Sequence, residues 1–230
     1  MICISIVPAT NEEALSLLGR ALSRSDLVEL RIDRMDRPEL PVLLRAGRGK
    51  IIVTNRRHDE GGFFAGCESR RLELLHRAVE LGARLVDVEA RTGGKAVERL
   101  AGAVRSHGGK TGLIVSHHDL GGTPAAKVLA GRVEACRALG ADVVKIVTLA
   151  NRVSDNLRIL EILSQARDEG QAIISFCMGE QGRLSRVAAP LLGSCISYAS
   201  LEDGAATAPG QLTAAEMRTV LQILKGEGAR

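Results

Sequence analysis

Hydrophobic positions along the chain gather into eight short runs, separated by longer stretches in which apolar residues recur with helical spacing. The runs are rich in Val and Ile and almost continuously apolar, which is typical of parallel strands buried on both faces. They are Ile2–Val7, Leu27–Ile32, Ile51–Thr54, Arg84–Glu89, Leu113–Ser116, Val143–Val147, Ala172–Phe176 and Ser194–Tyr198. The pattern therefore predicts eight β-strands.

The stretches between the runs carry signals for helices. Asn11 is expected to cap a helix over Glu12–Arg24, and Thr123–Pro124 to open one with Pro at its first position. Thr213-Ala-Ala-Glu216 is a capping-box pattern that predicts the last helix. Further helices are predicted over Pro38–Arg45, Glu68–Leu81, Ala96–His107, Ser154–Asp168 and Ser185–Leu192.

Strands that alternate with helices predict either a closed (β/α)8 barrel or an open, doubly wound sheet. An open sheet usually has fewer strands in this length, and no GxGxxG motif follows the first run. A chain of 230 residues fits one barrel, which typically takes roughly 250 residues. We therefore predict an α/β protein with a single (β/α)8 TIM barrel over residues 1–230.

Composition narrows the classes of function. Aromatic residues make up 2% of the chain, which argues against a stacking surface for nucleic acid. The net charge of +4 is spread along the chain, so a mixed surface or a small anionic substrate explains it best. The five cysteines form no CxxC motif and fit free thiols in a reducing compartment. Neither a signal peptide nor a membrane span is indicated, so we expect a cytoplasmic protein.

Barrel enzymes carry their chemistry at the C-terminal ends of the strands, so polar residues there are candidates for a site. Lys145 lies among β-branched residues in the run Val143–Val147, where burying an ammonium is costly. Burial favours the neutral amine, which attacks ketones to form Schiff bases. A lysine that extends its ammonium to solvent is the alternative, and a Schiff-base lysine explains the pattern better.

His117 and His118 close the fifth run, directly before Asp119. Histidine is the usual general acid or base near neutral pH. A structural histidine bound to a loop carbonyl is the alternative. The chain has no HxxxH motif, so a metal site is not favoured.

Glu29 and Arg31 alternate within the second run, so their side chains point to the same face of the strand. They form either a structural ion pair or a set of ligands for substrate hydroxyl groups. Arg56 and Glu60 follow the third run, in a loop whose pair Gly61–Gly62 suggests unusual backbone angles.

Arg186 lies shortly after the seventh run, in what we expect to be a loop. Its guanidinium is suited to a carboxylate, although an isolated arginine is more often solvated. The segment Ala205–Gln211 contains a Pro-Gly pair and is expected to act as a lid. A buried lysine, a nearby histidine and an anion site together suggest Schiff-base chemistry on a hydroxylated, carboxylated ketone.

Several of these residues belong to motifs that occur in a fixed order along the chain. They are the strand with Ser5, Glu29-Leu-Arg31-Ile-Asp33, Thr54-Asn-Arg56 with Glu60-Gly-Gly62, Ser116-His-His-Asp119 with Thr123-Pro124, Lys145-Ile146, Gly182 to Arg186, Gly193-Ser194 and Ala208-Pro-Gly-Gln211. With these motifs, the chain resembles class I 3-dehydroquinate dehydratase, in its short, barrel-only form, over nearly its full length.

The resemblance implies conversion of 3-dehydroquinate to 3-dehydroshikimate in the shikimate pathway, without a metal or cofactor, by a cytoplasmic homodimer. It implies a Schiff base on Lys145, proton transfer by His118 and orientation of that histidine by Glu60, with His117 a bystander. It implies a substrate site made of Ser5, Glu29, Arg31, Arg56, Arg186, Thr207 and Gln211, in which Thr207 replaces the serine of many relatives.

Three other functions stay open. A class I aldolase would use phosphorylated substrates and a glycine-rich loop, which Gly179–Gly182 matches only faintly. A non-catalytic barrel that binds a metabolite would need neither Lys145 nor His118. A nucleic-acid binder would show an affinity that depends steeply on salt.

Overall fold

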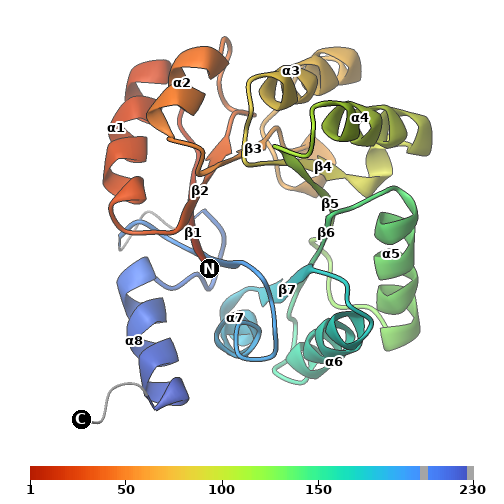
Figure 1. Ribbon diagram of the computed structural model, residues 1–230. Helices are drawn as coiled ribbons and strands as arrows, with labels where there is room; N and C mark the ends of the chain where they lie inside the picture. The colour runs from red at the N-terminus through yellow and green to blue at the C-terminus, as the bar shows by residue number, and fades with distance from the viewer. Residues whose placement is uncertain (203–206, 227–230) are drawn as a thin grey trace.

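Eight strands lie side by side in one parallel sheet, in the order β7-β6-β5-β4-β3-β2-β1-β8. In the computed structural model, which describes residues 1–202 and 207–226, this sheet curls around a central axis (Figure 1). The Cys195 amide, just before β8, donates to the Ile173 carbonyl at the start of β7 at 3.0 Å, which nearly closes the barrel. The strands are β1 Ile2–Ile6, β2 Leu27–Arg31, β3 Ile51–Thr54, β4 Leu85–Glu89, β5 Gly112–Asp119, β6 Val143–Leu149, β7 Ile173–Met178 and β8 Ser197–Ala199.

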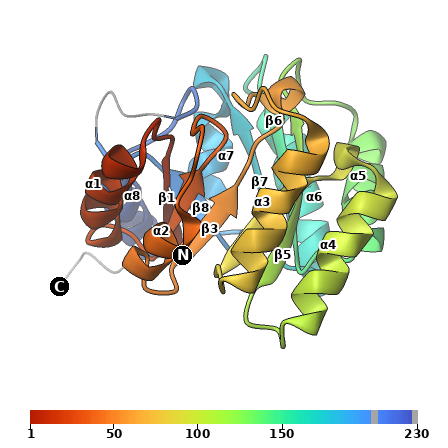
Figure 2. The same ribbon diagram turned by 90° about the horizontal axis from the view of Figure 1, so that it is seen from above.

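Eight α-helices surround the strands (Figure 1), and α3 to α5 run along the outer face of the sheet in Figure 2. They are α1 Asn11–Leu22, α2 Leu40–Ala46, α3 Glu68–Glu80, α4 Gly94–Ser106, α5 Ala126–Ala138, α6 Asp155–Asp168, α7 Arg183–Ala188 and α8 Ala214–Lys225. The predicted (β/α)8 barrel is therefore confirmed. None of these described helices combines the length and the apolar character that crossing a membrane requires.

Two predicted helix starts were wrong. Thr10, not Asn11, caps α1, because its hydroxyl accepts from the Glu13 amide at 3.2 Å. The Asn11 side chain instead bonds to the backbone at Arg37 and Glu39. Pro124 does not open α5, which begins two residues later, and its carbonyl accepts from the Arg158 side chain. The capping box of Thr213 and Glu216 at the start of α8 is confirmed.

Alternation along the strands divides the core into two parts. Val144 and Ile146 point outward and pack in the large apolar layer between sheet and helices. Val143 and Val147 point inward, where a smaller apolar cluster fills part of the barrel. Because residues two apart share a face of a strand, Lys145 also points inward.

Candidate active site

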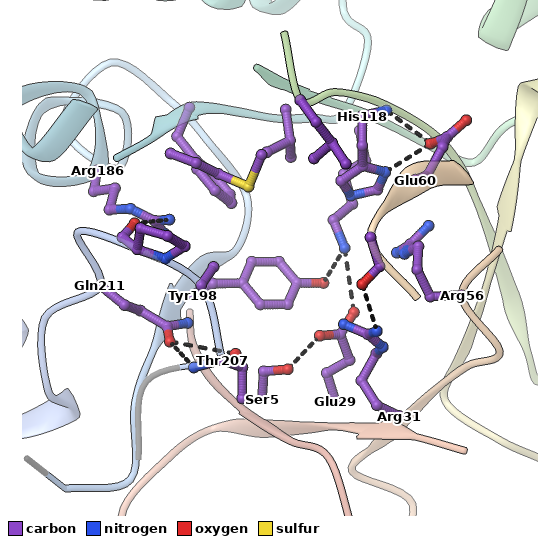
Figure 3. Close-up of a pocket in the computed structure, with 18 residues that line it drawn as sticks. Ser5, Glu29, Arg31, Arg56, Glu60, His118, Arg186, Tyr198, Thr207 and Gln211 are labelled. Atoms are coloured by element: carbon purple, nitrogen blue, oxygen red, sulfur yellow. Dashed lines mark hydrogen bonds and ion pairs between the residues drawn. The ribbon is translucent and has the colours of Figure 1, made fainter. Parts of the chain in front are cut away.

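A pocket of about 200 Å³ opens at the C-terminal ends of the strands. Every residue that the sequence predicted for the site lines it (Figure 3), namely Ser5, Glu29, Arg31, Arg56, Glu60, His118, Lys145, Arg186, Thr207 and Gln211. They come from strands, loops, the 3-10 helix His58–Glu60 and helix α7, which are spread along the chain. The barrel thus brings together residues that are up to about 200 positions apart, as parallel strands that end at the same rim allow.

Lys145 lies inside the barrel and is 3% exposed. It donates to Asp87 at 2.8 Å, Glu29 at 3.2 Å and the Tyr198 hydroxyl at 3.2 Å. The prediction of an ammonium among apolar side chains was wrong. The apolar residues that flank Lys145 in sequence do not surround its ammonium, because its neighbours in space are polar groups of β2, β4 and β8. Two carboxylates balance its charge.

A chain of buried ion pairs extends from Asp87 toward the surface. Arg56 donates to Asp87 at 2.8 Å and to Glu89 at 2.7 Å, and Glu89 in turn accepts from Arg71 at 2.7 Å. Burial disfavours the charged form of Asp87, but Arg56 and Lys145 outweigh burial and hold its pKa far below the usual range. Arg56 is thus held in place mainly by acids of the protein.

Three members of this network, Asp87, Glu89 and Arg71, were not among the residues predicted from the sequence. A signal for the two acids is present, because Leu85–Glu89 places them at alternating positions of a strand, as β2 places Glu29 and Arg31. Arg71 carries no such signal, because charged residues are common on the solvent-facing side of an amphipathic helix such as α3.

Glu29 and Arg31 bind different partners, so the structural ion pair between them is not formed. Glu29 accepts from the Ser5 hydroxyl at 2.6 Å as well as from Lys145. Arg31 makes a two-pronged contact with Asp33, at 2.6 and 2.7 Å. Burial would raise the pKa of Glu29, but Lys145 counteracts it and the pKa is lowered, so the pocket holds an ionised carboxylate there.

The His118 ring and backbone amide both bond to one oxygen of Glu60, at 2.9 and 2.8 Å (Figure 3). Because this contact uses Nδ1, the ring presents Nε2 to the pocket. Burial and the charges of Arg56 and Lys145 hold the pKa of His118 well below its usual range. Burial and the charge of Glu89 raise the pKa of Glu60 to about 7. The pair therefore binds a further proton only near neutral pH or below.

The loop that carries Glu60 depends on its glycines. Gly61 has a φ of +84°, in the left-handed region that favours glycine. A Cβ on Gly62 would lie 2.0 Å from the Arg56 carbonyl oxygen. The backbone angles expected from this glycine pair are therefore present, and they allow the short 3-10 helix His58–Glu60 to turn Glu60 toward His118. His117 does not line the pocket.

Arg186 lies across the pocket from Arg56 and Glu60 (Figure 3). It lies on α7, in agreement with the helix predicted over Ser185–Leu192, so the loop position expected for Arg186 itself was wrong. Its guanidinium stacks on Phe176 at 4.5 Å and donates to the Pro209 carbonyl at 3.2 Å. Burial lowers its pKa to about 10, and it has no carboxylate partner in ranges 1–202 and 207–226. A buried cation without an acid is suited to an anionic ligand.

The segment after β8 forms part of the pocket wall. Gln211 accepts from the Thr207 amide at 2.9 Å and from its hydroxyl at 3.3 Å. Gly210 packs against the Gly179 carbonyl, where a Cβ would lie 2.3 Å from the oxygen. The first two residues of the predicted lid, 205 and 206, lie outside the described residues.

Across residues 1–202 and 207–226, no three His, Cys, Asp or Glu side chains converge into a set that could hold a metal ion. What converges is a lysine, a neutral histidine backed by a carboxyl, an unpaired arginine and several hydroxyl and carboxylate groups. Such a pocket can bind a small anion with hydroxyl groups, attack it with an amine and move a proton.

Comparison with known proteins points to one family. A family model described as type I 3-dehydroquinase matches residues 2–227. The chain is 36% identical to 3-dehydroquinate dehydratase of Desulfotalea psychrophila, over 95% of this chain and 96% of that one. It is 39% identical to 3-dehydroquinate dehydratase of Thermococcus gammatolerans, over 98% and 100%. The crystal structure of 3-dehydroquinate dehydratase from Geobacillus kaustophilus gives a TM-score of 0.90 at 26% identity, covering 99% and 92% of the two chains.

The buried ion pairs predict a large effect of Asp87→Asn on stability. Because this change removes one carboxylate that Arg56 and Lys145 share and leaves one buried positive charge uncompensated, we expect the free energy of unfolding to fall by about 3–5 kcal/mol. Urea unfolding monitored by circular dichroism measures it. Glu73→Gln is the control, because it removes an exposed pair with Arg70 that contributes less than about 1 kcal/mol. Equal losses in the two variants would show that the buried pairs do not hold the barrel together.

Proposed function

Since the chain belongs to the type I 3-dehydroquinase family and is a hydro-lyase, we propose that it removes water from 3-dehydroquinate through a Schiff base on Lys145. The product is 3-dehydroshikimate, in the shikimate pathway toward chorismate and the aromatic amino acids. The observation that carries the mechanism is one pocket in which the Lys145 amine, the His118 imidazole and the Arg186 guanidinium face a common space.

In the first stage, the Lys145 amine attacks the C3 ketone of the substrate. Its ammonium gives up one proton as the bond forms and a second as water leaves, and both protons go to the ketone oxygen, while Asp87 and Glu29 hold the nitrogen by hydrogen bonds. The carbon–nitrogen bond forms as the carbonyl electrons move to oxygen, which gives a carbinolamine. Loss of that oxygen as water leaves an iminium, an electron sink that acidifies the neighbouring C2 proton.

In the second stage, His118 takes the C2 proton on Nε2, and the electrons of that bond move toward the iminium. They then return to form the C1–C2 double bond as the C1 hydroxyl leaves with the proton from His118. Water hydrolyses the resulting iminium, which releases 3-dehydroshikimate and restores Lys145. General acid–base help of this kind contributes on the order of 10²–10⁴-fold in rate.

Different residues of the pocket are proposed to bind the carboxylate and the hydroxyl groups of the substrate. Arg186 is proposed to hold the substrate carboxylate, because a planar guanidinium matches its two oxygens. Glu29, Ser5 and Gln211 offer acceptors and donors for the hydroxyl groups. Arg31 and Arg56 are already bound to acids of the protein, so their direct contact with substrate stays a prediction. The homodimer and the cytoplasmic location also stay predictions.

The aldolase alternative is less well supported by the loop after β7. A phosphate site there would use free backbone amides. The Gly179 amide instead donates to the Pro209 carbonyl at 3.1 Å, and the Gly182 amide donates to the Gly179 carbonyl at 2.9 Å. The anion site of this pocket is therefore proposed to be a side chain, Arg186, that suits a carboxylate.

Borohydride trapping tests the covalent step. With 3-dehydroquinate and borohydride, we expect a ligand-sized mass on the peptide that contains Lys145, because reduction makes the imine permanent. Lys145→Ala should lose both adduct and turnover, whereas the exposed Lys127 should tolerate the same change. A Lys145→Ala enzyme with nearly full activity would contradict the Schiff base.

The pH dependence of kcat/KM tests the acid–base pair. His118 serves as a base only while the Glu60–His118 pair lacks its extra proton, and the pKa of Glu60 is raised to about 7. We therefore expect kcat/KM to level off above that pH and to fall about tenfold per unit below it. In Glu60→Gln, the remaining titration is that of His118, whose pKa is lowered, so the midpoint should move to lower pH.

The matched control is Asp59→Asn, which changes an exposed acid on the same 3-10 helix. Its midpoint should stay where the unaltered chain has it. A midpoint that also stays unchanged in Glu60→Gln would remove Glu60 from the titrating pair.

Arg186→Ala should separate binding from folding. Loss of a buried guanidinium–carboxylate contact costs about 2–5 kcal/mol, so we expect KM for 3-dehydroquinate to rise on the order of 100-fold. The melting temperature should hold or rise, because the change removes a buried cation that has no acid partner among residues 1–202 and 207–226. Arg152→Ala, which removes an exposed charge at the same end of the barrel, should change neither. A large drop in melting temperature for Arg186→Ala would instead indicate a structural role.

A further inference from the structure

Tyr198 has a hydroxyl at the reacting nitrogen that the mechanism above does not use. Its oxygen lies 3.2 Å from Lys145 Nζ, which also lies 4.3 Å from the centre of the tyrosine ring. The ring projects into the pocket with its hydroxyl directed away from Arg186 (Figure 3). From sequence, this residue is indistinguishable from an apolar wall residue.

The hydrogen bonds around Nζ leave the phenol proton of Tyr198 free. The ammonium has three protons and three acceptors, which are Asp87, Glu29 and the Tyr198 oxygen. Tyr198 therefore accepts from the lysine, and its own O–H has no acceptor among residues 1–202 and 207–226. A buried hydroxyl normally donates as well as accepts, so this proton is available to a ligand bound at Nζ.

The ring that carries this hydroxyl is held in one place. Tyr198 is 5% exposed, lies in β8 beside Cys3 of β1, and packs against Phe176 with ring centres 6.0 Å apart. Burial and the charge of Glu29 raise its pKa well above the usual range, so the phenol keeps its proton at neutral pH. A ketone oxygen lies two bonds from the nitrogen that attacks it, so an oxygen on the Tyr198 side would be within hydrogen-bond reach of the phenol.

Imine formation has a proton balance that this arrangement satisfies. An ammonium and a ketone become an iminium and water, so two of the three nitrogen protons must move to the ketone oxygen. No outside acid or base is consumed. The step needs a group that can form hydrogen bonds both to the lysine nitrogen and to the ketone oxygen.

We propose that Tyr198 is a further catalytic residue, a proton relay from Lys145 Nζ to the ketone oxygen of the substrate. As the carbon–nitrogen bond forms, the phenol gives its proton to the ketone oxygen and takes one from Nζ. The same exchange delivers the second proton when the carbinolamine hydroxyl leaves as water, and the tyrosine ends each exchange unchanged. The inference rests on the proposed Schiff-base function, and it assigns imine formation to Tyr198 and elimination to His118.

The test is the rate of imine formation in Tyr198→Phe, which keeps the ring and removes only the hydroxyl. Enzyme in excess over ligand is mixed with 3-dehydroquinate or, separately, with 3-dehydroshikimate, and borohydride is added at successive times. We expect adduct formation to slow about 100-fold or more with either ketone, in line with general acid–base contributions. His118→Ala is the contrasting variant, and it should form the adduct with each ketone but hardly interconvert them.

Each outcome has a separate meaning. Equal adduct rates in Tyr198→Phe and the unaltered chain would overturn the relay while leaving the Schiff base intact. A variant that melts at a lower temperature but forms adduct at the normal rate would likewise give Tyr198 a structural role only. No adduct in the unaltered, folded chain would overturn the proposed function and the relay together.

Discussion

The structure depends on the balance of charge inside the barrel. Three carboxylates, from Glu29, Asp87 and Glu89, are paired with three cations, from Lys145, Arg56 and Arg71. Burying any one of these groups alone would be prohibitive. Because the pairs link β2, β4, β6, the segment after β3 and helix α3, they fix the positions of these elements relative to each other as well as the position of the lysine.

This balance separates the roles of the cations in the pocket. Lys145 is held by acids in an orientation from which it can lose a proton locally, whereas Arg186 has a carbonyl and an aromatic ring as neighbours. A ligand carboxylate is therefore stabilised most beside Arg186, because the positive charge of Lys145 is already balanced by Glu29 and Asp87. This difference supports the proposed orientation of the substrate, with its carboxylate at α7 and its ketone toward β6.

Much of this was predictable from the sequence, because the strands of a barrel are strongly patterned. Runs of β-branched residues located all eight strands, and the polar residues that interrupt them or follow them located the pocket. The environment of Lys145 was not predictable, because flanking residues such as Val144 face away from it and its true neighbours come from distant strands. Helix starts were less reliable, because Thr10 and Asn11 are both good caps, and the hydrogen bonds of Asn11 to the backbone at residues 37 and 39 leave Thr10 as the cap.

The least predictable feature is the hydroxyl of Tyr198, because one oxygen atom does not change the hydrophobic pattern of β8. A phenylalanine would fill the same space beside Phe176 and keep the ring against the ammonium. The hydroxyl gives the third nitrogen proton of Lys145 an acceptor and adds a donor for which the described part of the chain offers no acceptor. Because this donor lies beside the nucleophile and lacks an acceptor among the described residues, it fits the proposed role of meeting a ligand oxygen during the reaction.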